Sequence, residues 1–191
     1  MPQEYMQDQT FSKVSFQQHD IRGNEYDNCI FDNCILNQAN LSDCKFMDCT
    51  FRNCDLSLAV LARTSFQEVH FSHCKMMGMA FSACSSFALN FSFDNCYLQH
   101  SSFSKMKLKG MSFKHCQLQE VDFSAADLSA GLFEQCNMER TVFQQTNLEK
   151  ADLQTSFNYH IDPENNRLKK AKFSIWGLEG LLVKYDITIS K

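Results

Sequence analysis

Large apolar side chains recur at every fifth residue through most of this chain. Counting from Phe11, all fifteen such positions up to Phe81 are large and apolar. The series fails at Ser86, resumes at Phe93 two residues out of phase, and then runs without a miss to Leu153. A period of five matches neither the 3.6 residues of a helical turn nor the 2.0 residues of a long strand. It fits a chain that coils with flat sides, each of which buries one large residue.

A second column of smaller side chains lies two residues before each large one. It consists mainly of Cys, Ala, Ser, Thr and Val, and all ten cysteines fall in it, counting Cys84 in the register of the first half. The remaining three positions of each five are mostly polar or charged. This pattern predicts one large and one small inward residue per side, with core anchors at Phe31, Phe51, Phe71, Phe103, Phe123 and Phe143.

The composition limits the class of protein. The 191 residues are enough for one domain with a sizeable core, and 44% hydrophobic with 21% charged residues is typical of a globular protein. Two prolines and six glycines are too few for a fold built from tight hairpins. A net charge of −4 argues against direct nucleic-acid binding. The polar N-terminus and the absence of a long apolar run predict a cytoplasmic protein without membrane contact or disulfides.

The sequence carries no pattern that is typical of an enzyme or a metal site. The cysteines lie five residues apart and lack the C-x₂₋₄-C spacing of zinc sites. The histidines are dispersed, and neither G-x-S-x-G, H-E-x-x-H nor a glycine-rich phosphate loop occurs. We therefore expect a protein with no catalytic residues, no bound metal and no cofactor.

The repeat unit resembles that of the pentapeptide-repeat family. Cys44-Lys45-Phe46-Met47-Asp48 and Ala126-Asp127-Leu128-Ser129-Ala130 are two copies of it, and the resemblance covers roughly residues 11 to 157. It implies an all-β fold, a right-handed quadrilateral β-helix with four pentapeptides and therefore 20 residues in each coil. We expect this β-helix over residues 1–157 and a capping segment with a short helix over residues 158–191.

Charged residues of opposite sign recur at the same spacing of 20. The expected pairs are Glu25 with Lys45, Asp32 with Arg52, Asp43 with Arg63, Asp55 with Lys75, Lys107 with Asp127, Glu120 with Arg140, and Lys114 with Asp94 and Glu134. Such pairs on neighbouring strands help to fix the register. One column stays acidic, namely Asp8, Asn28, Asp48 and Glu68. Four further acids have no expected partner at this spacing, namely Asp122, Glu139, Glu149 and Asp152.

The break in the pattern lies between residues 82 and 92. Phe81 and Phe93 are twelve residues apart instead of ten, so the chain must bulge once. Phe87 and Leu89 cannot both hold regular inward positions. Two interpretations remain open: Phe87 is tucked in and repairs the core, or Phe87 and Leu89 form an exposed apolar contact for a partner.

The C-terminal segment departs from the repeat. Ser174 is a candidate N-cap for a short helix from about Ile175 to Tyr185, and Asp186 to Ser190 is predicted to form a short strand. The end of a coil exposes unpaired backbone and a slice of core, and therefore needs a cap. The segment either caps the coil alone or also forms a dimer. The candidate interface residues are Trp176, Leu178, Leu181 and Leu182.

Within the family, the chain is most similar to the Qnr-type quinolone-resistance and microcin-immunity branch. The similarity rests on the uninterrupted Phe/Leu coil, the phase break near its middle, a length near 200 and a cap of the form GLEGLLVKYDITI. It implies a cytoplasmic dimer, joined through its C-terminal ends into a rod with the width and surface charge of B-DNA. It also implies binding to DNA gyrase or topoisomerase IV, and protection of that enzyme from quinolones or gyrase-poisoning toxins.

Two functional hypotheses follow from the sequence. In the first, the chain is a topoisomerase-binding DNA mimic whose partner-binding residues are Asp8, Asp48, Glu68, Phe87, Leu89 and Asp122. In the second, it is a non-enzymatic interaction scaffold for an unrelated protein partner.

Overall fold

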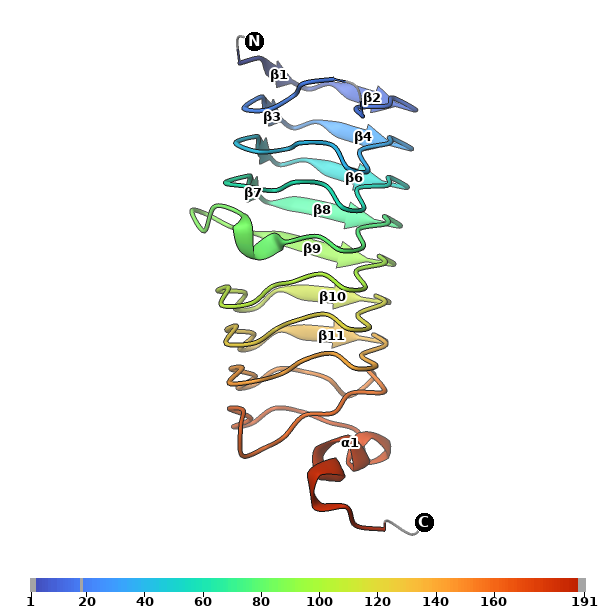
Figure 1. Cartoon of the computed structure of the whole chain (residues 1–191), viewed down its shortest axis with the longest axis vertical. Helices are drawn as coiled ribbons and strands as arrows, with labels where there is room; N and C mark the ends of the chain where they lie inside the picture. The colour runs from blue at the N-terminus through green and yellow to red at the C-terminus, as the bar shows by residue number, and fades with distance from the viewer. Residues whose placement is uncertain (1–2, 18, 189–191) are drawn as a thin grey trace.

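The chain folds into a parallel β-solenoid, a four-sided coil stacked into a rod with the two ends of the chain at opposite ends of the rod (Figure 1). The structure, a computed structural model, describes residues 3–17 and 19–188. The expected all-β coil with a short C-terminal helix is therefore confirmed.

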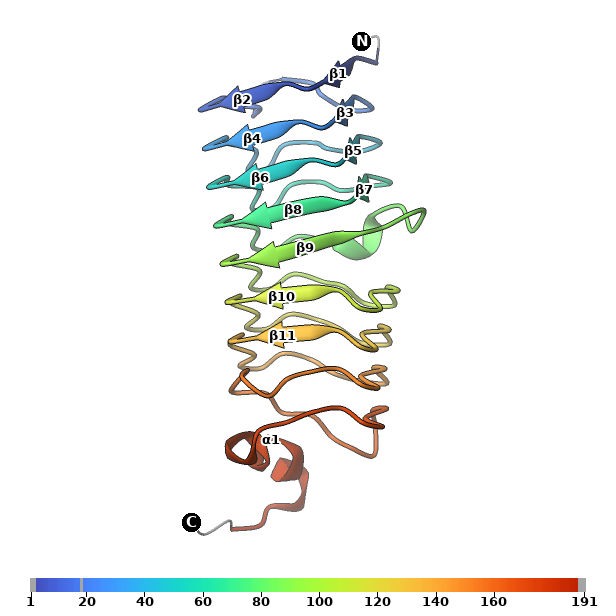
Figure 2. The ribbon, with the colours of Figure 1, turned by 180° about the vertical axis from the view of Figure 1, so that it is seen from behind.

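Two neighbouring sides of the coil are parallel sheets (Figure 2). The first side holds four strands, β1 (Tyr5–Gln7), β3 (Glu25–Asp27), β5 (Lys45–Met47) and β7 (Ser65–Gln67). The second side holds seven strands in the order β11-β10-β9-β8-β6-β4-β2. These are β2 (Thr10–Ser12), β4 (Ile30–Asp32), β6 (Thr50–Arg52), β8 (Val69–Ser72), β9 (Phe91–Asp94), β10 (Ser112–Lys114) and β11 (Leu132–Glu134).

Successive coils are joined in a fixed register of 20 residues. Phe31 pairs with Phe51, and Phe51 with Phe71, across the second side. Single parallel bridges, such as those of Asp122 with Ser102 and Val142, continue the same register on the other two sides. The backbone hydrogen bonds of each coil are therefore made to the coils before and after it.

The core is filled by stacked aromatic rings and small side chains. The rings of Phe31 and Phe51 stack with centroids 4.4 Å apart, and those of Phe103 and Phe123 with centroids 5.2 Å apart. Rings on different sides meet edge to face, so the stacks also lock against one another. All six expected anchors are buried, namely Phe31, Phe51, Phe71, Phe103, Phe123 and Phe143.

The corners of the coil have left-handed backbone geometry. The residue two positions after an anchor turns the chain with a positive φ, as at Asp48 (51°) and Asn53 (55°). Asn, Asp and Gly adopt this geometry most readily. Leu58 (59°) and Ala130 (56°) adopt it as well, so the coil imposes the turn even on residues that disfavour it.

The two extra residues form a loop that projects from the coil between β7 and β9, next to the 3-10 helix Phe81–Ala83 (Figure 1). Phe87 lies at the loop and is 76% exposed, so the alternative in which it repairs the core is wrong. Phe91 fills the core instead. It occupies the place of the small Val69 in the coil above and packs against Phe66 and Phe81.

The coil continues beyond residue 157. Parallel bridges join Asn147 to Arg167 and Asp152 to Lys172, so the helical cap begins later than the sequence boundary predicts. The five-residue series resumes in the same phase at Leu168 and Phe173, both packed against the core. Two gaps, at Asn158 and Pro163, hide this continuation in the sequence.

The cap consists of three short helical pieces: the 3-10 helix Ile175–Gly177, α1 (Glu179–Leu182) and the 3-10 helix Val183–Tyr185. Ser174 is the N-cap, and its hydroxyl accepts a hydrogen bond of 3.1 Å from the backbone N–H of Gly177. Gly177 and Gly180 lie directly against Tyr159, where a Cβ atom would collide. The predicted strand is absent over the described residues 186–188, and residues 189 and 190 lie outside the described part of the chain.

The stacked core predicts a large cost for removing one ring. Phe123→Ala is expected to lower the free energy of unfolding by roughly 3–5 kcal/mol, because the stack leaves a cavity that its neighbours cannot close. Chemical denaturation measures this directly. Val142→Ala, at a half-exposed position on the same side of the neighbouring coil, is the matched control and is expected to change the value by less than about 0.5 kcal/mol. Equal stability of the Phe123→Ala variant and the wild type would place Phe123 outside the core.

Candidate partner-binding surface

The acidic column forms one corner of the rod, between the first and second sides. We call Asp8, Asn28, Asp48 and Glu68 the acidic edge; all four have a positive φ and exposed side chains. Asn28 donates a hydrogen bond of 2.7 Å to Asp8, and Asn90 donates one of 2.7 Å to Glu68. None of the three carboxylates forms an ion pair with another residue that the structure describes, so their charge faces solvent.

The loop at the break adjoins this edge. Its neighbour Asn90 holds Glu68, and the Phe87 side chain is exposed while Leu89 is half-buried and packs against the core. A groove of about 600 Å³ lies beside the loop. It is lined by Ser82, Cys84, Ser86, Leu89, Ser104, Lys105, Met106 and Lys107. The loop therefore adds an apolar contact to the acidic edge.

Asp122 lies apart from these residues. It belongs to the column of Ser102 and Val142, on the side opposite the seven-stranded sheet. Its carboxylate accepts a hydrogen bond of 2.8 Å from the backbone N–H of Ser124. The structure thus brings together Asp8, Asp48, Glu68, Phe87 and Leu89 but not Asp122.

Most of the expected charge pairs are formed. Distances of 2.6 to 3.8 Å join Lys45 to Glu25, Arg52 to Asp32, Arg63 to Asp43, Lys114 to Glu134 and Arg140 to Glu120. Hydrogen bonds from Arg63 hold the pKa of Asp43 below its ordinary value. These pairs are exposed, so each contributes little to stability, and their main effect is to neutralise charge.

Other expected pairings are wrong. Asp94 interacts with His115, at 3.2 Å, and not with Lys114; Asp127 accepts from Asn147, at 2.8 Å. Within the described part of the chain, Asp55 and Lys75 pair through the backbone but form no ion pair. Two acids expected to be unpaired have partners, since Lys172 lies 3.0 Å from Asp152 and Arg167 lies 2.9 Å from Glu149.

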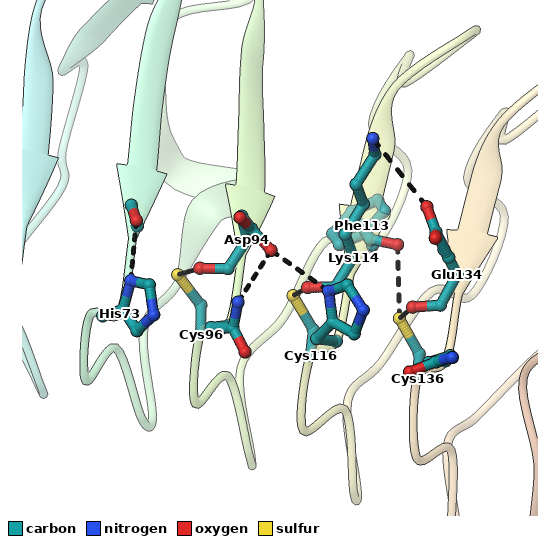
Figure 3. Close-up of polar contacts among 12 residues, drawn as sticks. His73, Asp94, Cys96, Phe113, Lys114, Cys116, Glu134 and Cys136 are labelled. Carbon is teal, nitrogen blue, oxygen red and sulfur yellow. Dashed lines mark hydrogen bonds and ion pairs between the residues drawn. The ribbon is translucent and has the colours of Figure 1, made fainter.

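The cysteines form stacks along the coil rather than a metal site. Figure 3 shows Cys96, Cys116 and Cys136 in one such stack, with thiols directed at backbone carbonyl oxygens. His115 and Asp94 lie on the surface beside it. Among residues 3–17 and 19–188, no group of three potential ligands could hold a metal ion. Burial raises the pKa of Cys49 and of Cys84 to about 12, which disfavours the reactive thiolate.

The C-terminal cap exposes a second apolar surface. Trp176 is 81% exposed and Ile175 is 76% exposed, and Leu178 is also exposed. Leu181 and Leu182 are half-buried, and Leu181 packs against the core. The four candidate interface residues therefore divide into two that are exposed and two that are half-buried, of which Leu181 holds the cap on the coil.

The family model for the pentapeptide repeat region matches residues 24–91 and 88–173. The chain belongs to the pentapeptide-repeat family. No curated protein sequence matches the chain.

Solved pentapeptide-repeat structures share the fold. HetL, involved in heterocyst differentiation regulation in the cyanobacterium Nostoc sp. strain PCC 7120, is 13% identical with a TM-score of 0.54, over 89% of this chain and 87% of HetL. A trypsin-treated form of QnrB1, a plasmid-mediated fluoroquinolone resistance protein, is 22% identical with a TM-score of 0.49, over 98% of this chain and 100% of that chain. The full-length form of QnrB1 is 20% identical with a TM-score of 0.47, over 96% and 100%. At 13% identity the likeness to HetL concerns the fold.

The helices of the described segments are all too short to span a membrane.

Burial of the thiols predicts how the cysteines of this pentapeptide-repeat protein react. In the native state, Cys84 is expected to react first with Ellman's reagent, because it alone is half-buried while the other nine are buried; the reaction should still be slow, because burial raises the pKa of its thiol. Unfolding in denaturant should release the rest. The variant Cys84→Ser is the control and should remove the early reaction. Rapid labelling of most cysteines in the native protein would contradict the stacked arrangement.

Proposed function

We propose that the chain binds a type II topoisomerase, DNA gyrase or topoisomerase IV, as a mimic of DNA, and thereby protects the enzyme from quinolones or gyrase-poisoning toxins. It acts by binding and not by catalysis. The acidic edge replaces the phosphates of DNA in the positively charged DNA-binding surface of the enzyme.

The observation that carries this proposal is the line of carboxylates that no cation of the described chain neutralises. Coils of a β-solenoid are about 4.8 Å apart, so Asp8, Asp48 and Glu68 present negative charge in a straight row. Elsewhere on the rod, acids such as Asp32 and Asp43 are neutralised by arginines of the next coil. The charge is therefore concentrated along one edge, where it can attract a basic surface.

The loop gives this edge a contact that DNA lacks. Phe87 is exposed next to Glu68's coil, and exposed aromatic side chains beside polar residues are typical anchors of protein interfaces. In the proposed complex, the carboxylates steer the rod to the topoisomerase and Phe87 with Leu89 adds apolar contact area.

The cap supplies the proposed dimer contact. The cap with α1 lies at the end of the rod, beyond the last coil (Figure 1). Its Trp176 and Leu178 side chains are exposed. Joining two chains at this end would double the length of the rod and bury both side chains. The dimer would present two acidic edges to the enzyme.

A non-enzymatic scaffold for an unrelated protein is the alternative function. The specific observation in its favour is that ion pairs neutralise much of the rod, unlike a uniformly acidic mimic of DNA. Recovery of partners on the immobilised chain distinguishes the two, since the alternative predicts that gyrase subunits are absent.

Charge reversal tests the role of the acidic edge. The double variant Asp48→Lys and Glu68→Lys is expected to bind gyrase at least about tenfold more weakly, because both attractive contacts become repulsive. Surface plasmon resonance at two salt concentrations measures the affinity. The double variant Asp122→Lys and Glu139→Lys changes the net charge equally on other sides and is expected to bind like the wild type. Unchanged affinity of the Asp48→Lys and Glu68→Lys variant would contradict the role of this edge.

Truncation of the exposed cap residues tests the dimer. Trp176→Ala combined with Leu178→Ala is expected to convert the dimer into monomers, as measured by sedimentation velocity. Ile35→Ala, at an exposed position on the coil, should leave the dimer intact. A double variant that sediments like the wild type would show that the cap does not join the chains.

A further inference from the structure

Unpaired charges are separated by sign along the first side of the rod and its edge. Before the loop they are acidic; after the loop they are basic except for Asp127, which accepts a hydrogen bond from Asn147. None of the residues that follow forms an ion pair with another residue of the described ranges 3–17 and 19–188. The acids are Asp8, Asp27, Asp48 and Glu68, and the lysines are Lys105, Lys107, Lys109, Lys150, Lys169 and Lys170.

The columns of the acids continue beyond the loop at four of these lysines, namely Lys109, Lys150, Lys169 and Lys170. Asp48 precedes Thr50 of β6 by two positions, and Lys150 precedes Asp152, which bridges to Leu132 of the same sheet, by two positions. Both therefore occupy the corner before the second side, and both have a positive φ, 51° at Asp48 and 61° at Lys150. By the same register, Lys169 continues the column of Asp27.

We propose that this side is an interface with a second copy of the chain, packed alongside in the antiparallel direction. A two-fold axis between two antiparallel rods places each column against the same column of the partner, in reversed order. The acidic half of one chain then faces the basic half of the other. Parallel packing would instead put acids against acids and lysines against lysines.

One position of the axis matches the unpaired charges. We place the axis midway between the coil that carries the loop and the next coil. The second coil before the loop coil in one chain then lies opposite the third coil after the loop coil in the partner. Asp48 then faces Lys150, and Asp27, three coils before the loop, faces Lys169, four coils after it. The axis repeats each of these contacts.

The loop and its groove fit the same arrangement. Phe87 of one chain lies opposite the coil of Lys107 in the other, where Leu89, Met106 and Lys105 line the groove. A volume of about 600 Å³ accommodates a phenylalanine side chain. Each chain would insert its exposed Phe87 into the groove of its partner, so the apolar contact sits next to the axis and the charge pairs lie outside it.

Such a dimer hides the edge that the proposed function uses. Asp48 and Glu68 would be covered, so lateral self-association and binding to a topoisomerase would exclude each other. The interface itself does not depend on that function, and it is separate from the contact at the C-terminal cap.

Engineered cysteines test the arrangement. In the double variant Asp48→Cys and Lys150→Cys, oxidation is expected to link most of the protein into disulfide-bonded dimers on a non-reducing gel. The two positions are five coils apart within one chain, about 24 Å, so they cannot form a disulfide with each other in a monomer. Each single variant should remain unlinked, because position 48 faces position 150 and not itself. A double variant that links no better than the single variants, or a Lys150→Cys variant that links to itself, would overturn the proposal.

A charge swap provides a second test without cross-linking. Lys150→Asp is expected to weaken self-association about tenfold in sedimentation equilibrium. The two-fold symmetry gives each dimer two Asp48–Lys150 pairs, and the substitution removes both. Adding Asp48→Lys should restore it to within about threefold of the wild type, because the pair is re-formed with the charges exchanged. Lys75→Asp, at an unpaired lysine on another side, is the matched control and should have no effect. A swap that fails to restore association would overturn the proposal, whereas gyrase binding by the Lys150→Asp variant tests the proposed function separately.

Discussion

The backbone hydrogen bonds between successive coils are the constraint on which the rest of this molecule depends. They fix a register of 20 residues, which places identical positions of neighbouring coils about 4.8 Å apart. At that spacing, flat rings stack face to face, as Phe31 does on Phe51, and opposite charges meet, as in Arg63 with Asp43. The same register lines up any unpaired charge into a row, so the acidic edge is a direct consequence of how the core is built.

The loop is the one place in the described coil where two residues are added without loss of this register. Val69 still pairs with Phe91 and Phe71 with Phe93, so the coils on both sides of the loop stay joined. The core stays filled at the break because Phe91 enters a column that holds Cys29, Cys49 and Val69 in the coils before it. Phe87 is thereby released to the surface, and the groove opens beside it. An insertion that costs the fold little thus supplies an exposed aromatic side chain in the middle of the rod.

Sequence periodicity predicts the coil, the anchors and the 20-residue register, because every coil buries the same kinds of side chain at the same positions. It does not predict which aromatic residue fills the core at the break. Phe87 and Phe91 both lie in the irregular segment, and the path of the loop decides which of the two side chains is buried. Asn, Asp and Gly recur two residues after the anchors, and this position in the repeat predicts the left-handed corners, whereas the overall composition does not. Asp48 lies two residues after its anchor Phe46 and Asp122 one residue before its anchor Phe123, and the structure shows that the two acids lie on different sides. The sequence also does not show which lysines of the first side are unpaired, because that depends on which acids form ion pairs in the folded chain.

The acidic edge, the exposed loop and the apolar cap together describe a rigid rod that acts through its surface. The cap extends the rod, the edge supplies charge, and the loop marks where one side changes from acidic to basic. The most direct measurement is gyrase supercoiling in the presence and absence of ciprofloxacin, across a titration of the purified chain. The proposed function predicts that supercoiling in the presence of the drug recovers as the chain is added. No recovery at any concentration would contradict it.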